Sequence, residues 1–156
     1  MIYGDTVKPE WVDYNGHLRD AFYMLIYSLT TDAFMDRIGL DEAGRHARQR
    51  TMYTLEAHVS YLREIKEGAA VRVDTRVIAF DKKRVHLYME MFEGEGTEVV
   101  SACEQMMMQI DTSGEPKAAS FDDEVGANVA AMERIAATEA RYAGRVIGLP
   151  VRVSAA

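Results

Sequence analysis

Residues 17–40 read "HLRDAFYMLIYSLTTDAFMDRIGL", and the spacing of their apolar side chains decides the fold. The apolar residues recur at offsets of three and four, and Gly39 follows them as a stop signal. This pattern predicts one long helix over about residues 19–38. Because the apolar stripe covers more than one narrow face, we expect the helix to be buried around most of its circumference. The residues that widen the stripe are Tyr23, Met24 and Tyr27.

From Thr51 onward the period of the apolar residues changes to two, which is typical of strands with one buried face. Turn-forming stretches such as "FDKKR" and "EGEGTE" separate the alternating segments, so neighbouring strands should pair antiparallel. The predicted strands cover about residues 51–61, 71–79, 85–91 and 100–110. A short strand over about residues 5–12 should precede the long helix, and an Ala-, Glu- and Arg-rich helix should follow over about residues 121–145.

The alternation also assigns side chains to the two faces of the sheet. In the first long strand, Glu56 and His58 should face away from the helix. The residues expected on the helix side of that strand are Tyr53, Leu55, Ala57, Val59 and Tyr61. In the last strand, the shared apolar face should consist of Val100, Ala102, Met106, Met108 and Ile110.

A long buried helix followed by an antiparallel meander is most simply packed by curling the sheet around the helix. This is the hotdog arrangement, an α+β fold, here with an added C-terminal helix. The alternative is the cone-shaped sheet of cystatin-like folds, which usually begin with more than one helix. We expect residues 1–156 to form a single domain, with a core over about residues 5–112 and a helical extension over 121–145.

Composition and charge narrow the function classes. A net charge of −7 argues against nucleic-acid binding, which depends on a basic surface. No stretch reaches the roughly 18 to 20 apolar residues of a membrane-spanning helix, and the start lacks the pattern of a signal peptide. Cys103 is the one cysteine, so we expect a reducing compartment, the cytoplasm. The four histidines are scattered, and we expect no metal site.

The segment "WVDYNGHLRD", residues 11–20, places an acid, a turn-forming Asn-Gly pair and a histidine immediately before the long helix. One interpretation is structural, because Asp13 can shape the turn or cap the helix. The other interpretation is an active site, because an acid on a turn before a helix lies near backbone N–H donors. The segment by itself is compatible with both.

The pattern Asp13-x-x-Gly16-His17, followed by a long helix and a meander, resembles the hotdog-fold acyl-CoA thioesterases of the 4-hydroxybenzoyl-CoA thioesterase type. The resemblance implies that Asp13 is the general base or nucleophile and that backbone amides around residues 16–18 polarise the thioester carbonyl. Gly16 would let the main chain approach the substrate, and His17 would contribute its amide more than its ring. The family usually continues with asparagines, whereas this chain has Leu18, Arg19 and Asp20.

A wider pattern, "PEWVDYNGH" with "YTLEAHVSYLREIK", resembles the betainyl-CoA thioesterases of carnitine breakdown, whose acyl group carries a trimethylammonium. Aromatic faces with nearby carboxylates bind such groups, although aromatic residues at these spacings more often belong to the core. The aromatic residues near the expected site are Trp11, Tyr14, Tyr23, Tyr27, Tyr53 and Tyr61. The predicted substrate-binding residues are Trp11, Tyr14, Asn15, Tyr23, Glu56 and His58, of which the last two have solvation or a partner subunit as alternatives.

The anionic tail of CoA needs basic side chains, and Arg63 and Lys66 in "YLREIKEG" are the predicted ones. Lys82, Lys83 and Arg84 are the alternative, but they lie in an ordinary solvated turn. The resemblance implies a homodimer or homotetramer, because family members generally build their sites between subunits. It also implies no cofactor, since coenzyme A is part of the substrate.

Two alternatives to a thioesterase stay open from the sequence. The first is a non-catalytic hotdog subunit that binds a small ligand, in which Asp13 only shapes the turn. The second is a hotdog dehydratase that acts on acyl thioesters. The position of the Asp-x-x-Gly-His pattern favours hydrolysis.

Overall fold

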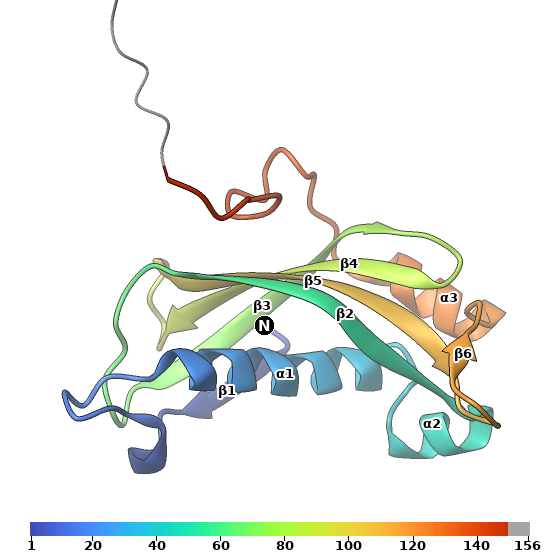
Figure 1. Cartoon of the computed structure of the whole chain (residues 1–156), viewed down its shortest axis with the longest axis horizontal. Coiled ribbons are helices and arrows are strands. Elements are labelled where there is room, and N and C mark those ends of the chain that lie inside the picture. Colours follow the sequence, from blue (N-terminus) through green and yellow to red (C-terminus); the bar gives the residue numbers. More distant parts are fainter. Residues whose placement is uncertain (150–156) are drawn as a thin grey trace, which may run out of the picture.

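The computed structural model describes residues 1–149 and shows one curved sheet with helices around it (Figure 1). Each predicted strand of the meander is present within two residues of its expected ends, and the long helix is present as well. In chain order the elements are β1 (Tyr3–Thr6), a 3-10 helix (Pro9–Trp11), α1 (Asp20–Arg37), α2 (Glu42–Arg48), β2 (Arg50–Tyr61), β3 (Ala70–Phe80), β4 (Arg84–Glu93), β5 (Val99–Asp111), β6 (Lys117–Ala118) and α3 (Asp123–Ala131).

The sheet is antiparallel throughout and has the order β1-β3-β4-β5-β2, with β6 paired to β5. Helix α1 lies against one face of this sheet, and the chain after α3 continues to the opposite face, where Ile135 and Ala140 pack with Tyr88 and Ala102 (Figure 1). This is the hotdog arrangement of an α+β fold that the sequence predicts. None of the helices in residues 1–149 is long and apolar enough to cross a membrane.

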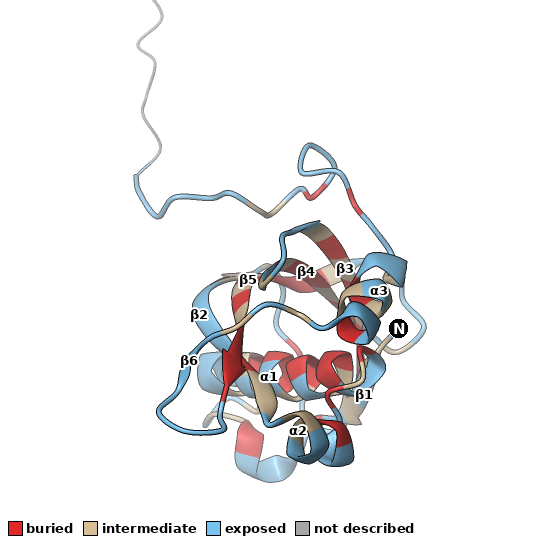
Figure 2. Cartoon of the chain, turned by 90° about the vertical axis from the view of Figure 1, so that its right-hand side faces the viewer, coloured by how far each residue is buried: buried red, intermediate tan, exposed pale blue. Residues whose placement is uncertain are grey.

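The core lies between α1 and the sheet, where Figure 2 shows the buried residues concentrated. Near the start of α1, Ile26 and Tyr27 pack with Met89 of β4 and other strand residues. Near its end, Phe34 and Ile38 belong to a second cluster on β3, β4 and β5. The helix ends where Gly39 takes a φ of +88°, and the N–H of residue 40 donates to the carbonyl of residue 35 (2.9 Å).

The expectation that α1 is buried around most of its circumference is confirmed except along one side of the helix. One side of α1 is exposed, because the sheet covers the helix from a single direction. Leu25 lies on this side and is 37% exposed. The other exposed residues of the helix are Asp20, Ala21, Ser28, Asp32, Asp36 and Arg37.

Strand β2 departs from strict alternation at Leu55. Thr54 pairs with Met107 and Glu56 with Met106, so Leu55 is an unpaired bulge residue. Before the bulge Met52 faces the core, and Tyr53 and Leu55 are about half exposed, which corrects the prediction that both face the helix. Beyond the bulge the prediction is confirmed, because Val59 packs against the core and Tyr61 contacts Tyr23 of α1.

In strand β5, too, an irregularity in the pairing changes which side chains face α1. The register of β4 with β5 shifts beside Val100, between the pairs Met91 with Ser101 and Phe92 with Val99. Met107 is consequently buried against α1, while Met106 and Met108 are only partly buried. The prediction that the latter two line the core face is therefore wrong.

The C-terminal helix is shorter than predicted. It covers Asp123–Ala131, and the chain then leaves the helix, because the backbone around Arg134 pairs with β3. The N–H of Val77 donates to the carbonyl of Glu133 (2.8 Å), and the N–H of Ile135 donates to that of Val77 (3.2 Å). This pairing and the burial of Ile135 outweigh the helical spacing of residues 132–145.

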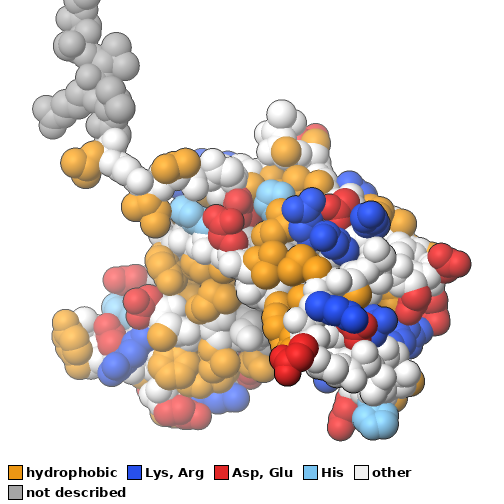
Figure 3. All heavy atoms as spheres, turned by 45° about the vertical axis from the view of Figure 1, so that its right-hand side comes forward, with side chains coloured by type: hydrophobic (Ala, Val, Ile, Leu, Met, Phe, Trp, Pro, Cys, Tyr) orange, Lys and Arg blue, Asp and Glu red, His pale blue; other side chains and the backbone are white. Residues whose placement is uncertain are grey.

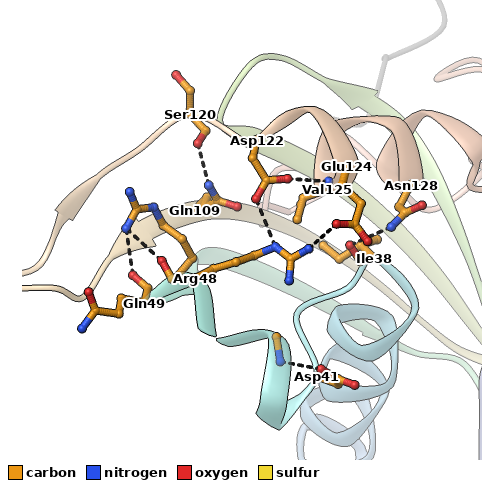
Figure 4. A network of polar contacts seen from close by, with 12 residues as sticks. Ile38, Asp41, Arg48, Gln49, Gln109, Ser120, Asp122, Glu124, Val125 and Asn128 are labelled. Carbon is orange, nitrogen blue, oxygen red and sulfur yellow. Dashed lines mark hydrogen bonds and ion pairs between the residues drawn. The ribbon is translucent and has the colours of Figure 1, made fainter. Parts of the chain in front are cut away.

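Two elements near the ends of α1 differ from the sequence prediction. The first strand ends at Thr6 rather than near residue 12, because Pro9 begins a 3-10 helix. Helix α2 was not predicted, although Asp41 caps it by accepting a hydrogen bond from the N–H of Gly44 (2.7 Å). Figure 4 shows that Arg48 links α2 to the start of α3 through Asp122 (3.1 Å) and Glu124.

Candidate active site

The Asp13 segment forms a tight turn immediately before α1. Val12 and Leu18 pair as an isolated bridge, and the N–H of Asp13 donates to the carbonyl of His17 (2.9 Å). Gly16 has a φ of +76°, a left-handed conformation that favours glycine. No atom lies within 4 Å of the position that a Cβ of Gly16 would occupy, so the backbone here is open to an approaching ligand.

The carboxylate of Asp13 is held by this turn. Its Oδ1 accepts hydrogen bonds from the N–H groups of Asn15 (2.8 Å) and His17 (3.1 Å), while within residues 1–149 no donor reaches Oδ2. The hydrogen bond from His17 lowers the pKa of Asp13, assisted by Asn15 and by the charges of His17 and Arg19. Asp13 is therefore ionised at neutral pH and keeps one oxygen available for chemistry.

The amides that the resemblance assigned to the thioester carbonyl are already occupied. Gly16 N–H donates to the carbonyl of Asp13 (3.0 Å), His17 N–H to the Asp13 carboxylate and Leu18 N–H to the carbonyl of Ile65 (2.8 Å). By contrast, the N–H of Asp20, the first residue of α1, has no hydrogen-bond acceptor among the described residues. The backbone N–H that is free to bind the thioester carbonyl therefore lies in the first turn of the helix, not at residues 16–18.

A cleft of about 360 Å³ opens beside Asp13, between the turn, the start of α1 and the end of β2. Tyr23 and Tyr61 meet in its wall, with ring centroids 5.3 Å apart and planes at 80°. Burial raises the pKa of Tyr23 to about 12, and burial with the nearby Asp20 raises that of Tyr61, so both phenols stay neutral at pH 7. The lining residues are Asp13, Asn15, His17, Leu18, Asp20, Tyr23, Tyr61, Leu62, Arg63 and Glu64.

Four of the predicted substrate-binding residues lie in or near the Asp13 segment, and two of them line the cleft. These two are Asn15 and Tyr23. Trp11 is 5% exposed and stacks on Phe22 at 5.8 Å, so its assignment to the substrate is wrong and it belongs to the core. Tyr14 is 94% exposed and does not line the cleft.

Glu56 and His58 lie on the face of the sheet opposite α1, as the alternation predicts. Their partners on β5 are Met106 and Glu104. The described chain does not bring either side chain into the cleft beside Asp13.

Of the two predicted CoA-binding residues, Arg63 lines the cleft and Lys66 lies next to it. The Arg63 side chain forms an exposed ion pair with Glu98, and its carbonyl accepts a hydrogen bond from the Tyr23 hydroxyl (2.9 Å). The backbone of Lys66 pairs with that of His17. Both basic side chains thus lie on the segment that closes one side of the Asp13 turn.

Three lining residues carry functional groups that were not among the predicted catalytic or substrate-binding residues, although Tyr61 was one of the aromatic residues expected near the site. Asp20 begins α1, Tyr61 ends β2, and Glu64 lies 3.5 Å from His17 Nε2. Asp20 follows Asp13 by seven residues across the turn, which is a usable signal. Tyr61 and Glu64 reach the site through tertiary pairing, which the sequence pattern does not reveal.

The curled sheet around α1 and the ionised acid beside the first helical turn define a thioester hydrolase of the hotdog type. The sequence profile of the Thioesterase-like superfamily matches residues 7–129, and the chain belongs to this superfamily. It is 44% identical to the betainyl-CoA thioesterase of Pseudomonas aeruginosa, over 95% of this chain and 94% of the relative.

Two further relatives extend the comparison. The L-carnitine dehydrogenase/betainyl-CoA thioesterase of Agrobacterium fabrum is 39% identical over 68% of this chain, a region that covers 22% of that relative. A solved protein of Staphylococcus aureus in complex with CoA is 29% identical and has a TM-score of 0.83, with 95% of this chain and 94% of that one covered.

Proposed function

We propose that this protein hydrolyses betainyl-CoA to betaine and CoA, as a step of carnitine breakdown. The observation that carries the proposal is the ionised Asp13 carboxylate, which has a free Oδ2 in a cleft next to the start of α1. The near full-length similarity to a betainyl-CoA thioesterase supports this acyl group. The reaction needs only water besides the thioester.

In the proposed reaction an oxygen attacks the thioester carbonyl carbon, the C–S bond breaks and CoA leaves as a thiol. Asp13 Oδ2 either takes a proton from the attacking water or attacks the carbon itself, after which water hydrolyses the resulting anhydride. The two hydrogen bonds at Oδ1 fix the carboxylate in either case. The free N–H of Asp20 is the proposed donor to the oxyanion, and the positive end of the helix dipole adds to it.

The CoA tail is proposed to lie along residues 63–66. Arg63 lines the cleft and would exchange its exposed pairing with Glu98 for a phosphate. Lys66 forms no ion pair within residues 1–149 and lies beside His17. Arginine and lysine bind phosphate by charge-assisted hydrogen bonds.

We also propose that the protein forms a homodimer through the free edge of β2. This strand is at the end of the sheet, and its residues 53–57 are all exposed. An exposed strand edge is a template for pairing with another strand, and Tyr53 and Leu55 are exposed hydrophobic residues on this one. Figure 3 shows one face of the molecule on which exposed hydrophobic side chains gather among charged ones.

Light scattering tests the homodimer. The wild type should have about twice the 17.5 kDa of one chain, and Leu55→Lys should weaken the association, because it places a charge on the exposed edge. Phe80→Lys, at an exposed residue on β3, is the matched control and should keep the wild-type mass. A wild type that stays at one chain mass would overturn the homodimer.

Thiol release from betainyl-CoA tests the proposed function. Asp13→Asn keeps an Oδ1 that accepts the same two N–H groups, but its amide takes no proton, so kcat should fall about 10²- to 10⁴-fold. Asp41→Asn is the matched control, because Asp41 makes a similar hydrogen bond to an N–H in α2.

The outcomes separate the alternatives for this site. Full activity of Asp13→Asn would remove Asp13 from the mechanism. No thiol release by the wild type from betainyl-, acetyl- or benzoyl-CoA would favour the non-catalytic binding subunit.

The cytoplasmic location stays a prediction that rests on the single cysteine, Cys103, which is free and buried.

A further inference from the structure

We propose that Tyr61, Tyr23 and Asp20 form the subsite that binds the quaternary ammonium group of the acyl chain. This inference rests on the proposed function, because it concerns the same cleft and the same substrate. It assigns the selectivity for a cationic acyl group to a particular pair of aromatic rings and one carboxylate. The two tyrosines are not needed to explain the attack by Asp13, and Asp20 takes part in it only through its backbone N–H, not through its carboxylate.

The chemistry of the acyl group fixes how far its charge can lie from the reacting carbon. In betainyl-CoA a single methylene separates the nitrogen from the thioester carbonyl. Ordinary bond lengths and angles place the nitrogen about 2.5 Å from the carbonyl carbon. A subsite for the ammonium group must therefore lie in the same cleft as Asp13, and the cleft of about 360 Å³ contains both.

The two tyrosines differ in exposure. The Tyr23 ring is buried and holds the Tyr61 ring in place, whereas the Tyr61 ring is exposed enough to contact a ligand. Tyr23 is 4% exposed and is fixed by its hydrogen bond to the Arg63 carbonyl. Tyr61 is 52% exposed although it is an aromatic residue in contact with the core. Core packing explains Tyr23 but leaves half of Tyr61 unexplained, and that exposed part lies in the wall of the cleft.

The charges around the cleft favour a cation. Three carboxylates line it, those of Asp13, Asp20 and Glu64. Arg63 is the one Lys or Arg among the lining residues of the described chain, and its guanidinium is paired with Glu98. A trimethylammonium group has no N–H to donate, so it is bound by aromatic faces and by nearby negative charge rather than by hydrogen bonds.

Asp20 connects the two parts of this subsite. Its carboxylate lines the cleft, its carbonyl lies 3.4 Å from the Tyr61 hydroxyl, and its Oδ1 accepts only the neighbouring N–H of Ala21 (2.9 Å). Within residues 1–149 no Lys or Arg pairs with this carboxylate. Its negative charge therefore remains available to a cation bound against Tyr61.

Two substrates of the same shape separate the effect of the positive charge of the acyl group from the effect of its size. Betainyl-CoA and 3,3-dimethylbutyryl-CoA differ only in having nitrogen or carbon at the branching atom, so the second is a neutral analogue of nearly the same size. The measured quantity is the ratio of their kcat/KM values, obtained from thiol release. Tyr61→Leu should lower this ratio about 2- to 30-fold, because it removes the aromatic face. Asp20→Asn should lower it about 2- to 5-fold while keeping the backbone of the helix start.

Two controls accompany these variants. Phe80→Leu removes an exposed aromatic ring on β3 that does not line the cleft, and it should leave the ratio unchanged. Light scattering on Tyr61→Leu checks that the assembly is the same as in the wild type, because Tyr61 lies on the edge strand.

Each outcome decides between the inference and the function on which it rests. If the wild type hydrolyses betainyl-CoA but Tyr61→Leu and Asp20→Asn change both substrates equally, the subsite is refuted and the proposed function stands. If the wild type does not prefer betainyl-CoA to its neutral analogue, the inference fails as well. If the wild type releases no thiol from betainyl-CoA, both proposals are overturned.

Discussion

Replacing Gly44 or Gly126 by alanine should change the stability of the protein in opposite directions, although helix propensity predicts the same change for both. Both glycines lie inside helices, Gly44 in α2 and Gly126 in α3, and neither has a positive φ. Propensity alone predicts that alanine at either position stabilises the protein by about 1 kcal/mol. The surroundings of the two residues are nevertheless different.

The magnitude follows from the space around each glycine. A Cβ on Gly44 would lie 2.2 Å from the carbonyl oxygen of Gly39 and 2.9 Å from Asp41 Oδ1. The first is a backbone atom that must move by about 1 Å, and the second belongs to the cap of α2. An overpacking cost of about 1–3 kcal/mol and a weakened cap of about 1 kcal/mol exceed the propensity gain, which leaves a net loss of about 2 kcal/mol.

Gly126 is the matched control. Its Cβ would lie 3.7 Å from the Cβ of Phe121, which is an ordinary contact, so the propensity gain of about 0.5–1 kcal/mol remains. For a chain of this size Gly44→Ala should lower Tm by about 4–8 °C, and Gly126→Ala should raise it by about 2 °C. Thermal melts followed by far-UV circular dichroism, with urea titrations, measure both. An increase of Tm for Gly44→Ala would refute the reasoning.

Three further predictions concern single groups. Carbon NMR titration should give Asp13 a pKa below its ordinary 3.8, so its ionised form stabilises the turn above the unfolded-state pKa, and this stabilisation disappears as pH falls through the lower folded-state value. A midpoint at or above 3.8 would contradict the hydrogen bonds at Oδ1. Burial raises the pKa of Cys103 to about 12, so the folded protein should not react with a thiol reagent until urea unfolds it; rapid labelling of the native protein counts against this burial. Arg48→Ala should lower the free energy of unfolding by about 0.5–1 kcal/mol, and less in 1 M salt, because its two ion pairs are partly exposed. A loss that is independent of salt would show that packing dominates.

The fold was largely predictable because the apolar residues of its helix and strands repeat regularly over long segments. The helical spacing of residues 19–38 and the alternation of β3 and β4 survive in the structure almost unchanged. The sequence analysis failed where one residue breaks the period, as at Leu55 in β2 and beside Val100 in β5. A bulge leaves no composition signal, since the extra residue is an ordinary apolar one.

The site was predictable only in its local part. Asp13, Asn15 and His17 could be placed together because one turn holds them. Tyr61 could be named as one of several aromatic residues near the expected site, but its place in the cleft depends on the pairing of β2 with β5, which the sequence does not specify. Trp11 was wrongly assigned because an aromatic residue near an acid looks the same in the sequence whether it stacks in the core or lines a cleft.

The bulge at Leu55 gives β2 one residue more than its pairing with β5 needs. Removing Leu55 would make Thr54 and Glu56 successive residues opposite Met107 and Met106, so the later side chains of β2 would keep their faces of the sheet. Tyr61, about 20 Å further along the strand, would stay paired with Ser101 and remain in the wall of the cleft. A single-residue deletion at Leu55 should therefore leave the choice of acyl group unchanged, whereas deleting a second residue between Leu55 and Tyr61 would turn Tyr61 to the other face.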